Sequence, residues 1–384
     1  YMKYLSRLLV KFQVPWPVVL VLLTVSFGYG GAVVRYHLPP LFEGLQTARN
    51  LFVDIVGLNS PLDEPLLSNA FTKPLPSIDE FLYRPALSIS DLTAQIEEMK
   101  VVPAERYFEV YSSLHVVDSP KPVAKKILEL NYQVGDDQPA KAYTYYLPSE
   151  RRDGTCGILL IPGSGDNQAL AISRGEGYHG PIAKSLIAHC DVFILIKPNH
   201  GYRSIHNGNH RLDADYWVYS GLLNSGNSYS ATYLTEGMAW AKYLSSSQEL
   251  WGVAGLSQGG EAAFLVSLQS DPVFAIISSG FSVYRAEAFR AQSDQIVIPG
   301  RFEHYDIATL RQIISASEVR YLLSSGGEND SPEMIKESRT NRTCTFLQSI
   351  AGERVTCVFH NGGHEFPIKD IDAFLTEMAF LNKG

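Results

Sequence analysis

Short apolar runs alternate with amphipathic segments over residues 105–384, and this alternation constrains the fold more than any other feature. The runs are GILLIP, DVFILIK, ELWGVAGLS, VFAIISSG, VRYLLSSGG and RVTCVFHNGG, and segments of helical periodicity such as ATYLTEGMAWAKYLSS stand between them. Continuous apolar strands joined by helices are typical of buried parallel sheets, because parallel strands need long crossovers that cover both faces. The pattern predicts an α/β fold whose mostly parallel central sheet has about eight strands, with helices on both faces.

Three β-rich runs precede this series: YFEVYSSLHVV, KKILELNYQV and AKAYTYYLP. Their partial alternation of apolar and polar residues predicts antiparallel strands at one edge of the sheet. Ligands of such sheets bind at the carboxyl ends of the strands, so the residues that follow each apolar run are the candidates for a functional site.

The N-terminal part of the chain carries a different pattern. Residues 14–34 form an uncharged apolar run of about 21 residues, which spans roughly 30 Å as a helix and matches a bilayer core. Lys3, Arg7 and Lys11 precede the run, which favours a cytoplasmic N-terminus and an extracytoplasmic remainder. We therefore expect residues 1–35 to form a membrane anchor; a cleaved signal peptide and a buried helix are the alternatives.

Residues 36–104 contain scattered prolines and only short stretches of helical periodicity, such as SISDLTAQIEEMK. Proline interrupts helices and sheets, so this pattern indicates a spacer with short helices. The catalytic domain is then expected to occupy residues 105–384.

Composition excludes some functions and leaves the redox compartment open. The chain is 45% hydrophobic with a net charge of −8, which is typical of a globular protein and argues against a nucleic-acid partner. None of the four cysteines forms a C-x-x-C motif. Cys156, Cys190 and Cys357 lie in or beside apolar segments and are expected to be small buried side chains. A disulfide between Cys344 and Cys357 is the alternative if the domain lies in an oxidising compartment.

The stretch VAGLSQGG contains the pattern G-x-S-x-G, with Ser257 between Gly255 and Gly259. It follows an apolar run and precedes a helical segment. A serine in a sharp strand-to-helix turn stands above the sheet at a helix N-terminus, where developing negative charge is favoured. Ser257 is thus the candidate nucleophile; a helix-capping serine is the structural alternative.

A serine nucleophile needs a base, and the base needs a carboxylate that fixes its tautomer. His364 follows the last apolar run, in HNGGHEFP, and is the candidate base. The apolar run before that one, VRYLLSS, leads into SSGGENDSPE, which offers Glu328 and Asp330 as the carboxylate. The chain order of serine, acid and histidine is that expected for this topology.

An acyl-transfer site also needs N–H donors for the oxyanion. We expect one from the backbone of Gln258 and the other from Ser164 or Gly165, in the turn IPGSGDN that follows another apolar run. That turn lacks the complete glycine motifs of nucleotide-binding loops.

The loop NHGYRSIHNGNH supplies candidates for substrate contacts. His200 and Tyr202 follow the run DVFILIK and are expected to line the pocket. His206 and His210 raise a metal site as an alternative, but a loop rich in Asn and Gly gives the ligands no common helical face. We expect neither a metal nor a cofactor.

The pieces PGSGDN, PNHGYRS, GLSQGG, GGENDSP and NGGHEFP, in this order, resemble the α/β-hydrolase superfamily over residues 105–384. GLSQGG and the segment IPGRFEHYDIATLRQIISASEVRYLLSSGGEND are similar to the dienelactone-hydrolase-like and acetyl-xylan-esterase-like branches. The resemblance implies hydrolysis of an ester or related acyl bond without a cofactor. It also places the acid three residues after Gly327, which selects Asp330.

These observations together predict a membrane-anchored, extracytoplasmic serine hydrolase that cleaves carboxylic esters through an acyl-enzyme. Its expected substrate is an O-acylated (for example acetylated) glycan, a lipid ester or a small xenobiotic ester, and the glycan ester is favoured. A peptidase or thioesterase on the same fold is one alternative, and a catalytically silent binding or assembly module is another.

Overall fold

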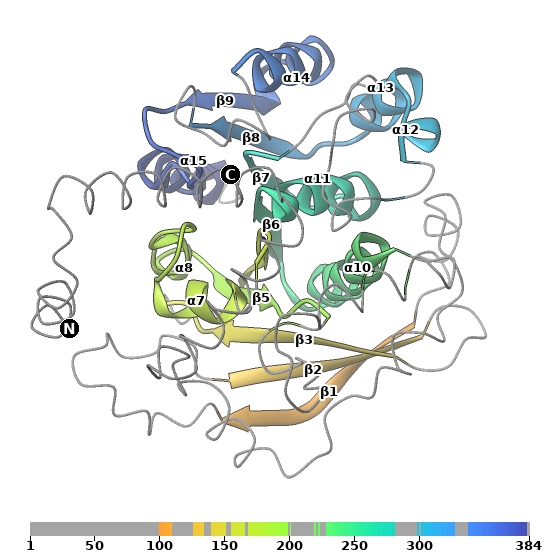
Figure 1. Cartoon of the computed structure of the whole chain (residues 1–384), viewed down its shortest axis with the longest axis vertical. Coiled ribbons are helices and arrows are strands. Elements are labelled where there is room, and N and C mark those ends of the chain that lie inside the picture. Colours follow the sequence, from red (N-terminus) through yellow and green to blue (C-terminus); the bar gives the residue numbers. More distant parts are fainter. Residues whose placement is uncertain are drawn as a thin grey trace, which may run out of the picture. The chain divides into compact units, whose positions relative to one another are not determined.

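A computed structural model defines the fold over most of the region that is expected to be catalytic (Figure 1). It describes residues 100–109, 126–133, 140–150, 155–165, 168–198, 200, 219, 222, 228–280, 298, 301–326 and 337–381. The apolar run 14–34 lies outside these residues, and no helix within them is long and apolar enough to cross a bilayer.

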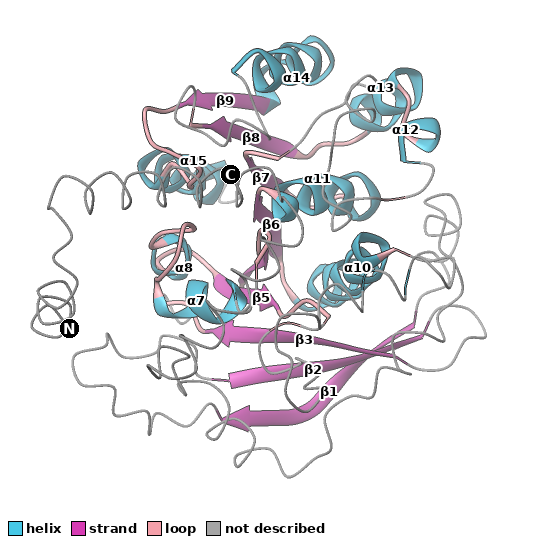
Figure 2. Cartoon of the chain, in the orientation of Figure 1, coloured by secondary structure: helices cyan, strands magenta, loops and turns pink. Residues whose placement is uncertain are grey.

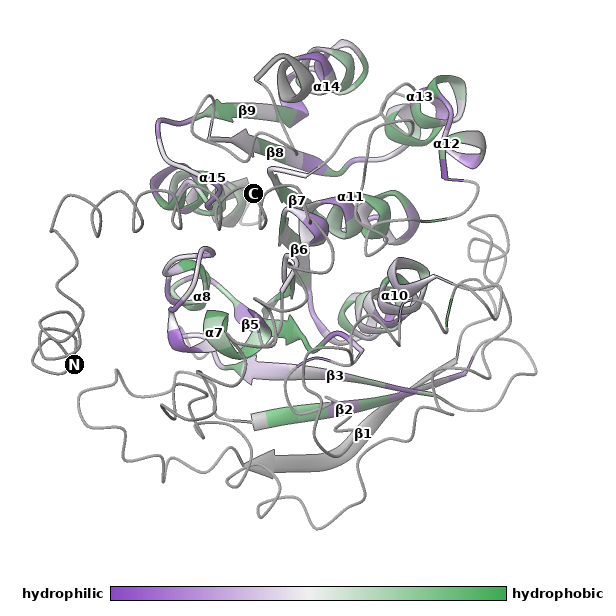
Figure 3. Ribbon diagram, viewed as in Figure 1, coloured by the Kyte–Doolittle hydropathy of each residue, from purple (hydrophilic) through white to green (hydrophobic). Residues whose placement is uncertain are grey.

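The described strands form one nine-stranded sheet, in the order β1-β2-β3-β5-β4-β6-β7-β8-β9. The strands on the β4 to β9 side pair in parallel. Their bounds are Cys156–Ile161 (β4), Asp191–Leu195 (β5), Leu250–Leu256 (β6), Phe274–Ser278 (β7), Arg320–Ser325 (β8) and Val355–Phe359 (β9). Every residue of β4 to β7 is buried, and Figure 3 shows β5 hydrophobic over most of its length. The α/β fold with a mostly parallel sheet is confirmed.

Three antiparallel strands form the expected edge of the sheet. They are β1 (Lys100–Glu109), β2 (Lys126–Gln133) and β3 (Ala140–Leu147). The sheet therefore has one strand more than the roughly eight expected, and β1 already begins before residue 105.

Helices cover both faces of the sheet (Figure 2). On one side lie α7 (Gln168–Arg174), α8 (Ile182–Ile187) and α15 (Ile368–Leu381), and on the other α10 (Tyr229–Ser247), α11 (Gln258–Ser270), α12 (Arg301–His304), α13 (Ile307–Ala316) and α14 (Glu337–Ala351). Three of these, α7, α12 and α13, fall in segments where the sequence predicted no helix.

Alternate side chains of each strand face opposite layers, as the pleat requires. Leu159, Val253 and Ala275 belong to the core that also contains residues of α10, α11, α13 and α14. Phe274, next to Ala275, instead meets Phe374 of α15. Both faces are therefore buried in apolar layers, which explains why the strands are apolar throughout.

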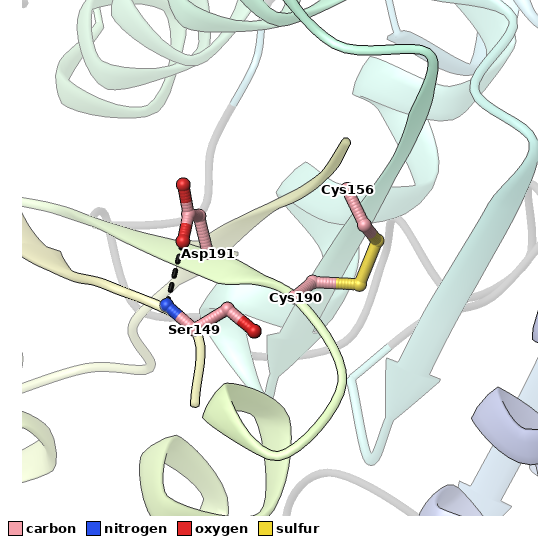
Figure 4. The surroundings of a disulfide bond; sticks show 4 residues. All are labelled: Ser149, Cys156, Cys190 and Asp191. Carbon is pink, nitrogen blue, oxygen red and sulfur yellow. Dashed lines mark hydrogen bonds between the residues drawn. A yellow bond between two sulfur atoms is a disulfide. The ribbon is translucent and has the colours of Figure 1, made fainter. Parts of the chain in front are cut away.

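Two disulfides correct part of the cysteine prediction. Cys156 and Cys190, expected as separate buried side chains, are bonded to each other, and Cys344 of α14 is bonded to Cys357 of β9. The first bond joins the amino ends of β4 and β5 (Figure 4). Only the pairing of these strands brings its two cysteines together, and that pairing is not visible in the sequence.

Replacing both Cys156 and Cys190 by serine should lower the free energy of unfolding by about 2 to 4 kcal/mol, because the bond restricts the unfolded chain. Its sequence separation is 34 residues, against 13 for the other disulfide, so the matched replacement of Cys344 and Cys357 should cost less. Urea unfolding of oxidised protein measures both effects. A double variant as stable as the parent would contradict the expectation.

Candidate active site

Ser257 occupies the turn between β6 and α11, with φ 60° and ψ −123°. A non-glycine residue with positive φ is strained and costs about 1 to 3 kcal/mol, so such positions cluster at functional sites. The Ser257 side chain does not cap the helix that follows it. The structural alternative of a capping serine therefore has no support.

The two glycines of the motif are required by close packing around this turn. A Cβ atom on Gly255 would collide with the carbonyl of Gly259, and one on Gly259 would collide with the carbonyl of Ile161. The turn thus lies against the carboxyl end of β4, and only glycine fits at either position.

Backbone hydrogen bonds connect Ser257 to the carboxyl ends of β7, β8 and β9, one after the other. The Ser257 N–H donates to the carbonyl of Ser278 at the end of β7 (2.8 Å), and the Ser279 N–H donates to Ser324 of β8 (2.9 Å). The His360 N–H donates to Ser325 (3.0 Å), which links β8 to the segment after β9. The segment that carries His364 therefore starts on the same sheet edge as Ser257.

Contacts through Tyr178 bring His364 back toward the serine turn. Tyr178, between α7 and α8, stacks on the His364 ring with centroids 5.6 Å apart. Its hydroxyl donates to the carbonyl of Ser164 (2.8 Å). The preceding residue, Gly163, lies against Tyr178 and against the carbonyl of Leu256, next to Ser257. The elements carrying Ser257 and His364 are thus connected through Tyr178 and Gly163.

Both candidate acids, Glu328 and Asp330, and the candidate substrate contact Tyr202 lie outside the described residues. The last described residue before the acids, Gly326, packs its backbone against those of Gly362 and Gly363. The segment that leads to Asp330 therefore leaves the sheet beside the loop that contains His364.

His200, the other candidate substrate contact, belongs to the described residues and is only 2% exposed. Its ring stacks on that of Tyr229 in α10, with centroids 5.9 Å apart. Its assignment as a substrate contact stays a prediction. Within the described ranges, no three His, Cys, Asp or Glu side chains are grouped as a metal site, and His206 and His210 lie outside them.

The expected oxyanion donors are close to two side chains, Lys197 and His179, that no sequence motif singles out. The buried Lys197 amine donates to the carbonyl of Gly163 (2.6 Å) and to Oε1 of Gln258 (2.5 Å). The Gly163 N–H donates to Nε2 of His179 (2.9 Å). In the sequence, Lys197 is recognisable only as the charged residue that ends the apolar run DVFILIK.

His179 is fully buried and uncharged at neutral pH. Burial, the Lys197 charge and His364, in that order, lower the pKa of His179 to about 3. Because Nε2 accepts a hydrogen bond from Gly163, the proton of the neutral ring lies on Nδ1. A neutral ring of fixed tautomer holds the turn in one orientation.

This pKa predicts a specific dependence of stability on pH. Below pH 6.5 the unfolded chain protonates His179 and the folded chain does not, so unfolding becomes easier down to about pH 3. Above pH 6.5 the group contributes nothing. Between pH 7 and 5 this loss should amount to about 2 kcal/mol. His179→Gln keeps an acceptor for Gly163 and should remove that loss, as urea unfolding at both pH values would measure; equal losses in both proteins would refute it.

A strained serine in a strand-to-helix turn, at the carboxyl edge of a mostly parallel sheet, has the backbone geometry that is typical of α/β-hydrolase folds. The strand order and the geometry at Ser257 therefore define an α/β-hydrolase fold.

No protein-family model and no curated protein matches the chain. Among solved structures it is similar to acetyl xylan esterase 1 from Thermoanaerobacterium sp. JW/SL YS485, at 16% identity over 82% of this chain and 99% of that chain, with a TM-score of 0.46. It is also similar to TT1662 from Thermus thermophilus, at 17% identity over 62% of this chain and 93% of that chain, with a TM-score of 0.41. A third similar structure is an acylaminoacyl peptidase from Pyrococcus horikoshii, at 13% identity over 67% of this chain and 45% of that chain, with a TM-score of 0.39. These values bear on neither activity nor substrate, so the fold assignment rests on strand order and the turn at Ser257.

Proposed function

We propose that the chain is a serine hydrolase that cleaves carboxylic esters with Ser257 as nucleophile, His364 as base and Asp330 as the acid that orients His364. The observation that carries this proposal is the strained backbone at Ser257, with φ 60° and a side chain that leaves the helix uncapped. A chain gains nothing in stability from such a residue, whereas a nucleophile elbow imposes this backbone conformation on its serine.

The chemistry follows from the roles of these groups. His364 takes the hydroxyl proton while Ser257 Oγ attacks the ester carbonyl. The tetrahedral intermediate places its negative charge toward the N–H groups of Gln258 and of Ser164 or Gly165. His364 then gives its proton to the departing alcohol, which leaves an acyl-enzyme. A water molecule, deprotonated by His364, releases the acid and restores the serine.

The proposed setting is extracytoplasmic, with residues 14–34 as the membrane anchor. The chain has four cysteines, and all of them are paired in the two disulfides. Structural disulfides persist in oxidising compartments and are rare in the reducing cytosol. Their presence supports a catalytic domain outside the cytosol, where small esters or O-acylated glycans would be the substrates.

Activity of the purified full chain against a panel of acyl compounds tests this function. The panel contains p-nitrophenyl esters of increasing acyl length, an O-acetylated xylo-oligosaccharide, a thioester and an aminoacyl anilide. Release of acetate or another short acid from the oxygen esters is expected. Preference for the thioester or the anilide would identify a thioesterase or a peptidase instead of an esterase. No turnover of any compound would favour a silent binding module.

A further inference from the structure

Three successive peptide groups of the turn after β4 are held by side chains from outside the turn. The N–H of Gly163 donates to His179 (2.9 Å), and the carbonyl of Gly163 accepts from Lys197 (2.6 Å). The carbonyl of Ser164 accepts from the hydroxyl of Tyr178 (2.8 Å). Burial raises the pKa of Tyr178 to about 12, so this hydroxyl remains a donor at physiological pH.

These contacts fix the direction of the N–H groups that follow. A trans peptide is planar, and its C=O and N–H point in opposite directions. The Gly163 carbonyl, held by Lys197, therefore directs the Ser164 N–H away from Lys197. In the same way, Tyr178 directs the Gly165 N–H. Within the described part of the chain, neither of these two N–H groups donates a hydrogen bond.

Lys197 also contacts the other half of the expected oxyanion hole. Its amine lies 2.5 Å from Oε1 of Gln258, the first residue of α11, whose backbone N–H follows the nucleophile. One amine thus bridges the turn after β4 and the start of α11. Lys197 is only 1% exposed, and its amine lies 5.6 Å from the ring centroid of Tyr233. Burying an ammonium costs several kcal/mol, so a position like this one is more often functional than stabilising.

We propose that Lys197 is the positioning residue of the oxyanion hole and that Ser164 supplies its second N–H donor. Lys197 sets the distance between the turn and Gln258, so that both backbone N–H groups meet the same oxygen. Gly163, whose carbonyl Lys197 holds, lies against the carbonyl of Leu256, which belongs to the peptide group that precedes Ser257. This favours the Ser164 N–H over that of Gly165. The inference rests on the proposed function, and it adds a residue and a choice of donor that the function alone does not give.

Steady-state hydrolysis of p-nitrophenyl acetate by Lys197→Met in the full chain tests the proposal. Methionine matches the length of lysine without its charge or its donors. We expect kcat to fall about 100-fold, as for the loss of one oxyanion donor, while KM changes less than about threefold, because the interaction matters in the transition state. An unchanged kcat would overturn the proposal.

Tyr178→Phe is the matched control, because it keeps the ring that stacks on His364 and removes only the hydrogen bond to Ser164. If Ser164 is the donor, Tyr178→Phe should lower kcat less than Lys197→Met does. A larger loss in Tyr178→Phe would assign the donor to Gly165 and overturn the proposal.

Should Lys197→Met not fold, as near-ultraviolet circular dichroism would show, Gln258→Met serves instead. It retains the backbone N–H and removes the side-chain link to Lys197, so kcat should fall with KM unchanged, and full retention of kcat would overturn the proposal. Parallel assays of the parent and Ser257→Ala distinguish a failure of the proposed function from a failure of this inference. Equal activity of these two proteins overturns both the proposed function and this inference, whereas serine-dependent activity that ignores Lys197 overturns the inference alone.

Discussion

Replacing Ser257 by alanine should lower kcat for p-nitrophenyl acetate by at least about 10⁴-fold, because the acyl-enzyme can no longer form. Ser267→Ala in α11, the helix that follows Ser257, is the matched control. Ser267 is buried and its hydroxyl donates to the carbonyl of Phe264, so its loss should leave kcat unchanged. Retention of more than about 1% of parental activity by Ser257→Ala would contradict the assignment of the nucleophile.

The backbone at the same position adds a stability readout. Alanine at φ 60° keeps the strain of Ser257, whereas glycine adopts this conformation freely. Ser257→Gly should therefore be more stable than Ser257→Ala by about 1 kcal/mol, although both are inactive. Urea unfolding of the two variants measures the difference, and a less stable glycine variant would argue against a strained turn.

Asp330→Asn should lower kcat by about 10⁴-fold, because an asparagine holds the histidine in the wrong tautomer. Glu328→Gln is the matched control from the same segment and should change kcat little. The pair decides between two carboxylates that the sequence offers and that lie outside the described residues. A large loss in Glu328→Gln with an active Asp330→Asn would reverse the assignment.

The sequence predicts much of this fold because each buried strand is a continuous apolar run. The same logic selects Ser257 and His364 as candidate site residues, since residues that follow such runs lie at one sheet edge; their catalytic roles stay predictions. The helices α11 and α15 were predictable from their periodicity. The helices α7, α12 and α13 were not predicted.

What the sequence does not reveal depends on contacts between distant segments. Lys197 stands 34 residues from Gly163 and 61 from Gln258 along the chain, and only the neighbouring positions of β4, β5 and β6 bring the three together. The bond between Cys156 and Cys190 has the same origin, because β4 and β5 pair in parallel. Local patterns carry no information about which strands become neighbours.

Covalent labelling of the full chain with a fluorophosphonate, followed by peptide mass spectrometry, decides whether Ser257 is an activated nucleophile. We expect one phosphonyl group per chain, attached to Ser257, and slow or absent labelling in His364→Ala, where no base activates the hydroxyl. A folded protein that takes up no probe, or that carries it on another residue, would contradict the account.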